Sequence, residues 1–539
     1  MRAITRRTAL ASGAAVAAGV ALTSCSGGDR DANDEFQEKV ENPDDNVITD
    51  TDDRRIVKKK TEITFMSGRP PTTAENWDDV ACVAKAEEIT GLHINWGLVP
   101  SEGVSEKRNL QLASGDYPGV FYRTGVSSGD IVKYANQGSF MPLDQLIEDF
   151  MPNFQAVMDR NEGVREAITF PDGKIYTLPQ VYDKDFAAMR HPKKMWVRRD
   201  WLDEYGMSVP ETLDELEEYL REAVGRRDDV VGIANNGVGS VIEALLGTFQ
   251  VGNNGPDVGN VDLDPDSGMV RFYPAADGYR DLLELLQRFY ADGLIMEDLF
   301  SVDAQRVNTL GSNGLVACST THAPVGFFGA EEGEKYVALP PLKRQSSDET
   351  PTWNVIRPEV PTIGNFVMTD RCENPVEVAR WMDFWYGDEG ATAFFLGVEG
   401  ESYEEVDGEL ELLPEVTKGK TIDEALKPYA LYLGGGYPGY ATEKWVRAIE
   451  TSDQALEAVN MLKPHDIEEV WPAFTFTEDE SDFLSTTGND ISKFAEEGRA
   501  GFVTGERSIS EWESYVQQYE QMGIEEYLEI HQTAYERRR

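Results

Sequence analysis

Short apolar segments alternate with amphipathic helices from Glu62 onward, and this alternation restricts the chain to few folds. Strands are predicted at 63–66, 93–96 and 120–123, and helices at 77–90, 106–113 and 130–137. Strands joined through helices build a parallel sheet that is covered on both faces. Ligands of such sheets bind beyond the carboxyl ends of the strands. The loops at those ends hold Arg69, Trp77, Arg123 and Thr124.

The length and charge of the chain limit its organisation and its partners. With 539 residues, the chain exceeds what one hydrophobic core usually supports, so more than one domain is expected. The formal charge is −47, from 97 acidic and 50 basic residues. Such a field repels phosphate backbones, so nucleic acid is not an expected partner, and solubility outside the cell explains the acidity.

The first 25 residues are predicted to be an export signal rather than part of the fold. Arg6 and Arg7 resemble a twin-arginine signal, and Leu22-Thr-Ser-Cys25 resembles a lipobox, which predicts lipidation of Cys25 at the outer face of the cell membrane. An ordinary secretion signal with an accidental cysteine is the alternative, and the adjoining Ser-Gly-Gly disfavours it. Residues 26–60 are polar and poor in aromatics, which predicts a disordered tether spanning roughly 30 Å.

The stretch from Met195 to Leu216 is predicted to begin the second half of the fold. A strand leads into a short helix that stops at Gly206, a residue type that tolerates a left-handed turn. Thr212 and Glu215 have the spacing of a capping box at the start of a longer helix. Further predicted elements are the helix 278–292, the strand 317–322 that runs into a loop, the return to the first lobe at 359–369 and the hairpin around 407–408.

Several stretches, in this order along the chain, resemble extracellular solute-binding proteins of family 1. The quoted stretches are Asn109-Leu-Gln-Leu-Ala-Ser-Gly-Asp-Tyr-Pro118, Pro171-Asp-Gly-Lys-Ile-Tyr-Thr-Leu-Pro179, Met195 to Leu216, Phe289-Tyr-Ala-Asp-Gly-Leu-Ile295 and Tyr527-Leu-Glu-Ile-His-Gln-Thr-Ala-Tyr535. The similarity is greatest to the large lipoproteins that carry oligosaccharides, including alginate oligosaccharides, to ABC importers.

This resemblance implies an α/β fold of two lobes, like that of periplasmic binding proteins, with a hinge and an interlobe cleft. The first lobe is expected at 61–182, completed by about 359–420, and the second, more helical lobe at 183–358, completed by about 421–539. The expected protein is a monomer without a cofactor. Its expected partners are an oligosaccharide, the permease subunits of an ABC importer and, through the lipid alone, the membrane.

Two sequence patterns resemble functional motifs, one for a catalytic serine and one for a calcium site. Gly125-Val-Ser127-Ser-Gly129 satisfies the nucleophile-elbow motif, but a helix cap explains it equally well, and no histidine shows a supporting context. The acidic run 262–268 resembles a calcium loop, but its sixth position is Ser267 and its twelfth is Tyr273, so a hairpin turn is expected. The calcium-loop insertion of alginate binders is reduced here to 225–230.

We therefore expect no enzyme and no metal site. A surface glycoside hydrolase or polysaccharide lyase, and a non-transporting glycan sensor, remain as alternatives. Cys82, Cys318 and Cys372 show no paired spacing and are expected to be buried thiols.

Aromatic side chains near predicted loops and crossovers indicate a carbohydrate cleft, because sugar rings stack on such rings. The set consists of Trp77, Tyr122, Tyr182, Trp196, Trp353, Tyr437 and Tyr440. Each one alone is more often a core residue. Polar partners for the sugar hydroxyls are expected from Arg69, Arg123, Arg190, Arg198 and Gln180, with the arginines also suited to a uronate carboxylate. Alternation along the strand places Trp196 and Arg198 on one face.

Overall fold

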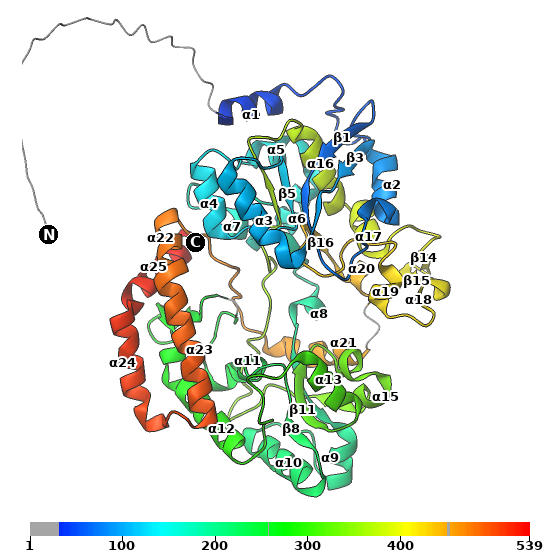
Figure 1. Cartoon of the computed structure of the whole chain (residues 1–539). Coiled ribbons are helices and arrows are strands. Elements are labelled where there is room, and N and C mark those ends of the chain that lie inside the picture. The colour runs from blue at the N-terminus through cyan, green and yellow to red at the C-terminus, as the bar shows by residue number, and fades with distance from the viewer. Residues whose placement is uncertain (1–31, 257, 450–452, 539) are drawn as a thin grey trace, which may run out of the picture.

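The chain folds into two lobes joined by several crossing segments, as the computed structural model in Figure 1 shows. The structure describes residues 32–538 except 257 and 450–452. The two-lobed α/β architecture predicted from the sequence is confirmed. The export signal and Cys25 lie outside the described residues. Across the described segments, no helix is both long and apolar enough to span a bilayer.

The first lobe is built on a four-stranded sheet with the order β13-β5-β2-β4. Its strands are β2 (Met66–Arg69), β4 (Leu98–Pro100), β5 (Val120–Tyr122) and β13 (Phe366–Met368). The first three are parallel, as predicted, and β13 is antiparallel to β5. Two parallel pairs extend this layer, namely β1 (Thr61–Thr64) with β3 (Leu92–Asn95) and β6 (Gln180–Tyr182) with β16 (Gly439–Ala441).

Helices from three parts of the chain cover the first lobe. They are α1 (Ala32–Glu41), α2 (Ala81–Thr90), α3 (Ser101–Ser114), α4 (Ser128–Asn136), α5 (Asp144–Phe150), α6 (Pro152–Arg160), α7 (Glu162–Ile168), α16 (Pro375–Tyr386), α17 (Asp388–Leu396), α18 (Pro414–Thr417), α19 (Ile422–Leu426) and α20 (Glu443–Val446). The predicted hairpin around Asp407 forms β14 (Tyr403–Val406) and β15 (Glu409–Leu412).

The second lobe has a four-stranded sheet with the order β12-β7-β11-β8. Its strands are β7 (Lys194–Arg198), β8 (Val231–Ile233), β11 (Val316–Thr321) and β12 (Tyr336–Ala338), and a separate hairpin joins β9 (Val261–Leu263) to β10 (Val270–Phe272). Strand β11 is parallel to β8 and antiparallel to β7. The short helix α8 (Ala187–Arg190) lies in the segment that joins the lobes.

The second lobe is also rich in helices. They are α9 (Arg199–Tyr205), α10 (Leu213–Arg226), α11 (Gly239–Leu245), α12 (Asp277–Ala291), α13 (Ala304–Ser312), α14 (Pro324–Phe328), α15 (Ala330–Gly333), α21 (Asp453–Leu462), α22 (Glu478–Phe483), α23 (Asn489–Thr504), α24 (Trp512–Met522) and α25 (Ile524–Arg538). The predicted capping box of Thr212 and Glu215 is present at α10, and Gly206 ends α9 with a φ of 71°.

The segment before the first strand is folded, so the prediction of a disordered tether is wrong for residues 32–60. Phe36 and Val40 of α1 are buried in the first-lobe core. The guanidinium of Arg380, on α16, donates hydrogen bonds to the backbone carbonyls of Ile48 and Asp53. Composition measures how many apolar residues a segment has. It does not show that a few of them have a docking surface on another element.

The first lobe also extends beyond the boundary expected near residue 420. Strand β16 pairs in parallel with β6, and Trp445 is buried in the first-lobe core. The buried residues of α21, which begins at Asp453, belong to the second-lobe core instead. The chain therefore leaves the first lobe after α20, because β16 is needed to pair with β6.

Candidate functional site

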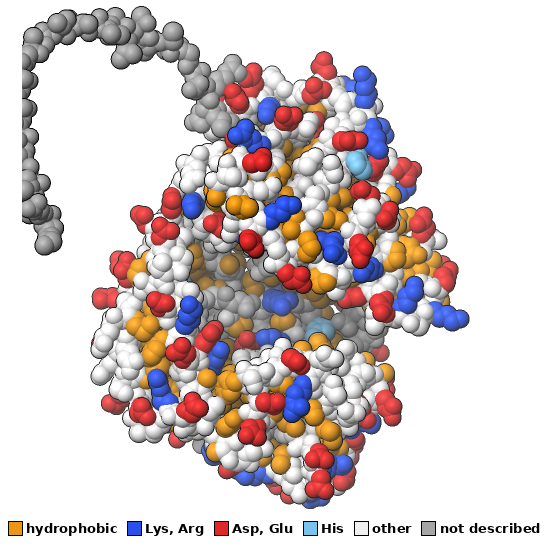
Figure 2. Space-filling model, viewed as in Figure 1, with side chains coloured by type: hydrophobic (Ala, Val, Ile, Leu, Met, Phe, Trp, Pro, Cys, Tyr) orange, Lys and Arg blue, Asp and Glu red, His pale blue; other side chains and the backbone are white. Residues whose placement is uncertain are grey.

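The carboxyl ends of the parallel strands in both lobes lie on the side of the crossing segments. In the first lobe, Tyr122 at the end of β5 pairs with Phe366, where β13 begins after the crossing. In the second lobe, Thr321 at the end of β11 pairs with Lys194, where β7 begins after the other crossing. Parallel sheets bind ligands at such edges. Figure 2 shows that the molecular surface is hollowed between the two lobes.

A pocket of about 250 Å³ opens at this edge of the second lobe. Its lining comes from the residues just before β7, the loop after β8, the end of β11 and the helices α11, α13 and α14. The phenyl ring of Phe327 on α14 is 45% exposed at this pocket, whereas Phe328 is 3% exposed. The ring of Phe328 packs against Tyr336 with centroids 5.4 Å apart. The buried neighbour therefore fixes α14 and leaves Phe327 available to a ligand.

Asn235 supports the pocket without being free itself. Its side-chain oxygen accepts from the Thr320 amide at 2.9 Å, and its amide nitrogen donates to the Thr320 carbonyl at 2.8 Å. This bidentate contact holds the loop after β8 against β11. The hydroxyl of Thr320 is buried without a hydrogen-bond partner. Thr320 therefore has an unused polar group within the lining of the pocket.

The other polar groups of the pocket are mostly neutral. Within the part of the chain that the structure describes, the side chains of Asn236, Ser240 and Asn308 have no intramolecular hydrogen bond. The ammonium of Lys193 is paired with the Glu243 carboxylate at 2.5 Å. The pocket thus offers amides and a hydroxyl beside an aromatic ring.

Most aromatic residues proposed from the sequence lie in the cores rather than at this edge. In the first lobe, Trp77 is fully buried, and its indole N–H donates to the Thr73 hydroxyl at 3.2 Å. Its ring and that of Tyr122 pack against Trp96, with centroids 4.9 and 5.5 Å apart. Tyr437 is buried against Phe394, with centroids 5.0 Å apart. These rings stabilise the lobe and are not accessible to a sugar.

The second-lobe tryptophans are also core residues. Trp196 is 1% exposed, and its indole N–H donates to the Thr321 carbonyl at 2.9 Å. Trp353 is buried in the same core. All five residues of β7 are buried, because the strand lies between β12 and β11 and is covered on both faces. Alternation along such a strand does not select a cleft face.

Gln180, Tyr182 and Tyr440 lie together on the paired strands β6 and β16, and all three are buried. The amide of Gln180 donates to the Tyr182 hydroxyl at 3.2 Å, and the Tyr440 hydroxyl donates to Asp183. Tyr440 and Asp183 line a wider cavity of about 430 Å³. Most of its charged groups are paired with each other, as Arg160 is with Asp183 and Asp185 and Lys444 is with Asp388. This cavity is therefore a weaker candidate than the pocket at Phe327.

Three of the four proposed arginines are structural. Arg123 donates to the carbonyls of Leu431 at 2.7 Å and Leu433 at 2.8 Å, and burial lowers its pKa to about 10.

Arg198 is paired with Asp200 and Glu332, each at 2.7 Å. Arg190 donates to the Arg357 carbonyl at 2.9 Å. Arg69, half-buried at the end of β2, has no partner within the described residues and remains available.

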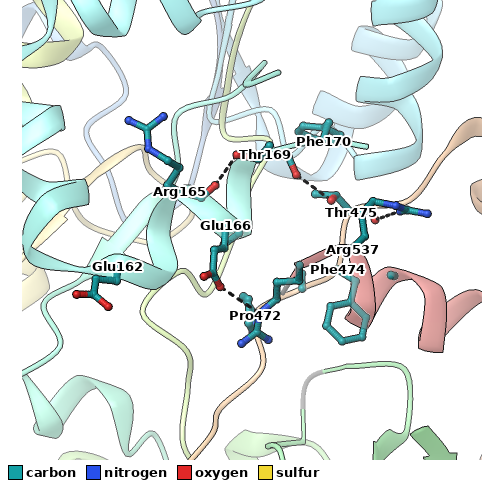
Figure 3. A pocket seen from close by; sticks show the side chains of 13 residues that line it. Glu162, Arg165, Glu166, Thr169, Phe170, Pro472, Phe474, Thr475 and Arg537 are labelled. Carbon is teal, nitrogen blue, oxygen red and sulfur yellow. Dashed lines mark hydrogen bonds and ion pairs between the residues drawn. The ribbon is translucent and has the colours of Figure 1, made fainter. Parts of the chain in front are cut away.

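A further cavity of about 350 Å³ lies between α7 and the end of α25 (Figure 3). The Thr475 hydroxyl donates to the Thr169 carbonyl at 3.0 Å, and Arg538 is paired with Glu166 at 3.3 Å. These contacts join the C-terminal helices, which pack on α12 of the second lobe, to the first lobe. The cavity is thus part of the interface between the two lobes.

The two patterns that suggested chemistry are explained by structure. The Ser127 hydroxyl accepts from the Asp130 amide at 3.1 Å and caps α4. Asp262 is paired with Arg271 at 2.7 Å in the β9–β10 hairpin. No group of three or more potential metal ligands occurs in the described segments. Cys82, Cys318 and Cys372 are buried thiols, as predicted.

Phe327, Asn236 and Asn308 were not identified from the sequence. A signal for Phe327 was present, because the strand at 317–322 was predicted to run into a loop, and Phe327 follows that loop directly. The site residues predicted from the sequence include none from this loop. Asn236 and Asn308 have no sequence signal beyond their residue type.

Comparisons with known proteins agree with this architecture. The model of the bacterial extracellular solute-binding protein family matches residues 70–392. The fructooligosaccharide ABC transporter substrate-binding protein FusA of Streptococcus pneumoniae is 23% identical over 504 residues, covering 89% of this chain and 91% of its own length. Lipoprotein LipO of Bacillus subtilis is 27% identical over 253 residues, covering 44% of this chain and 46% of its own.

Two solved structures share the fold over most of the chain. FusA in complex with kestose superposes with a TM-score of 0.71 at 22% identity, covering 88% of this chain and 99% of that one. The alginate-binding protein AlgQ2 without calcium ion superposes with a TM-score of 0.68 at 20% identity, covering 90% of this chain and 99% of that one. The chain belongs to the bacterial extracellular solute-binding protein family.

Proposed function

We propose that this protein captures an oligosaccharide in the hollow between its lobes and delivers it to an ABC importer. The observation that carries this proposal is the pocket of the second lobe, where the exposed ring of Phe327 lies beside the unpaired amides of Asn236 and Asn308. Sugar rings stack on aromatic faces, while their hydroxyls need neutral donors and acceptors.

The facing edge of the first lobe supports the same proposal. Arg69 is the last residue of β2 and lies on the side of the crossing segments. Its guanidinium, which has no partner among the described residues, can donate to hydroxyl groups. Closure of two lobes about a hinge brings such edges onto one ligand. The names of relatives that bind fructooligosaccharide and polygalacturonan also favour an oligosaccharide as the ligand class.

The protein's location and chemistry follow from the same proposal. Lipidation of Cys25 would hold a monomeric receptor at the outer face of the cell membrane, next to the permease. The ligand would be released unchanged, because the serine of the elbow-like motif is a helix cap and the family consists of binding proteins. No surface hydrolase or lyase activity is expected.

A thermal-shift screen of the mature protein against oligosaccharides and their monosaccharides tests the proposal. A ligand at 100 times its dissociation constant should stabilise the protein by about 2.7 kcal/mol. Hits should be incubated with the protein and analysed by chromatography, with no shorter products expected. The proposal is wrong if no oligosaccharide raises the melting temperature, or if the ligands are cleaved.

A further inference from the structure

Oligosaccharide ligands are either neutral or anionic, and the relatives' names include both kinds, since fructooligosaccharide is neutral and polygalacturonan is acidic. The lining of the second-lobe pocket bears on this difference, given the oligosaccharide function proposed above. None of the described residues that line the pocket carries a carboxylate. The cation at its rim, Lys193, is already neutralised by Glu243. Nδ1 of His322 accepts from the buried ammonium of Lys194 at 3.3 Å, so this nitrogen is not a donor for a ligand.

The groups left to meet a ligand include the amides of Asn236 and Asn308 and the hydroxyls of Ser240 and Thr320. Each has both a donor and an acceptor, which matches sugar hydroxyls, since those also donate and accept. A uronate carboxylate only accepts, and it loses solvation on entering a pocket. Among the described residues that line this pocket, the cation Lys193 is already paired with Glu243, so the lining does not compensate that loss.

The pocket also has the shape for a single ring. Its volume of about 250 Å³ is below the roughly 300–1,000 Å³ of pockets that enclose a whole small molecule. It therefore fits one unit of a longer chain. The buried neighbour Phe328 fixes the backbone of α14 at the rim, so little backbone freedom is lost when a sugar stacks on the ring of Phe327.

We infer that this pocket holds one uncharged sugar ring, stacked on Phe327 and hydrogen-bonded by Asn236 and Asn308, and that the protein selects neutral oligosaccharides over uronate-containing ones.

Calorimetric titration of the mature protein tests the ligand class. The panel pairs neutral fructo-, xylo- and galacto-oligosaccharides with oligogalacturonates and alginate oligosaccharides of equal length. At least one neutral ligand should bind about tenfold or more tightly than any acidic one, which is about 1.4 kcal/mol. The affinity for that neutral ligand should change less than about twofold between low and high salt, because screening acts on charged pairs. Tighter binding of an acidic ligand overturns the inference but leaves the proposed function intact. Absence of binding by either class overturns both.

Two matched variants test the pocket itself. Phe327→Ala should weaken the neutral ligand roughly thirtyfold, and Phe327→Trp should retain most of the affinity. Phe300→Ala is the control, because Phe300 is 38% exposed on the same lobe but does not line the pocket. Neither alanine variant should change the melting temperature noticeably, since both rings are partly in water. Unchanged affinity in Phe327→Ala would overturn the stacking assignment, even with the neutral preference observed.

Discussion

Replacement of Trp196 by alanine should destabilise the second lobe and leave ligand affinity unchanged. The indole is 1% exposed and donates to the Thr321 carbonyl at 2.9 Å. Removal of a buried aromatic side chain leaves a cavity and costs about 3–5 kcal/mol. For a lobe of this size, the melting temperature should fall by roughly 6–20 °C. The lost hydrogen bond adds little, because the Thr321 carbonyl lies at the pocket, where water can replace the donor.

Urea denaturation, followed by fluorescence, and calorimetric titration with the best ligand would be carried out on the same preparations. Trp196→Phe is the control, since it keeps most of the aromatic volume and should lose only a smaller cavity term, with little further loss for a hydrogen bond that water can replace. Affinity should stay within about threefold of wild type in both variants at temperatures where they are folded, which is under 1 kcal/mol. A large loss of affinity in Trp196→Ala with an unchanged melting temperature would refute the assignment of this side chain to the core.

Four further outcomes are expected. Arg123→Met should lower the free energy of unfolding by about 2–4 kcal/mol, because it leaves buried loop carbonyls without a donor; wild-type stability in urea would contradict this. Burial raises the pKa of Asp383 from 3.8 to about 6, so its contribution to stability is full below pH 3.8 and is lost as the pH rises through 6. Asp383→Asn should flatten that decline in melting temperature, and an unaltered pH profile would speak against it. Chelators should not change the melting temperature, because Asp262 is paired with Arg271, and a clear fall would reveal a metal site. Cys25→Ser should move the protein from the membrane fraction to the medium, and retention on membranes would disprove lipidation.

The elements of the fold were accessible from the sequence because they depend on local signals. The strand and helix rhythm of the first lobe, the glycine stop at Gly206 and the capping box at Thr212 are properties of neighbouring residues. The order of family-like stretches then supplied the two-lobed arrangement. Strand β13 was expected to return to the first lobe, and it does so at the edge of the sheet.

The candidate site was much harder to predict, because burial and pairing depend on distant partners. The carbonyl of Leu431, which binds Arg123, is more than three hundred positions away along the chain. Glu332, which pairs with Arg198, is also too far away for a local sequence pattern to indicate the pair. An aromatic residue in a predicted loop or strand has the same sequence signature whether it faces water or a core. The sequence does not show which of the two adjacent rings is exposed, whereas in the structure Phe328 is buried and Phe327 is exposed.

The docked segment at residues 32–60 determines how an anchored protein would stand on the bilayer. Cys25 and Ala32 are seven positions apart, a length of at most about 25 Å at full extension. Helix α1 lies at the end of the first lobe that is remote from the second (Figure 1). A lipid on Cys25 would then hold the start of α1 within about 25 Å of the membrane surface. The first lobe would stay close to the headgroups, and the second lobe would be the part that swings when the hinge closes.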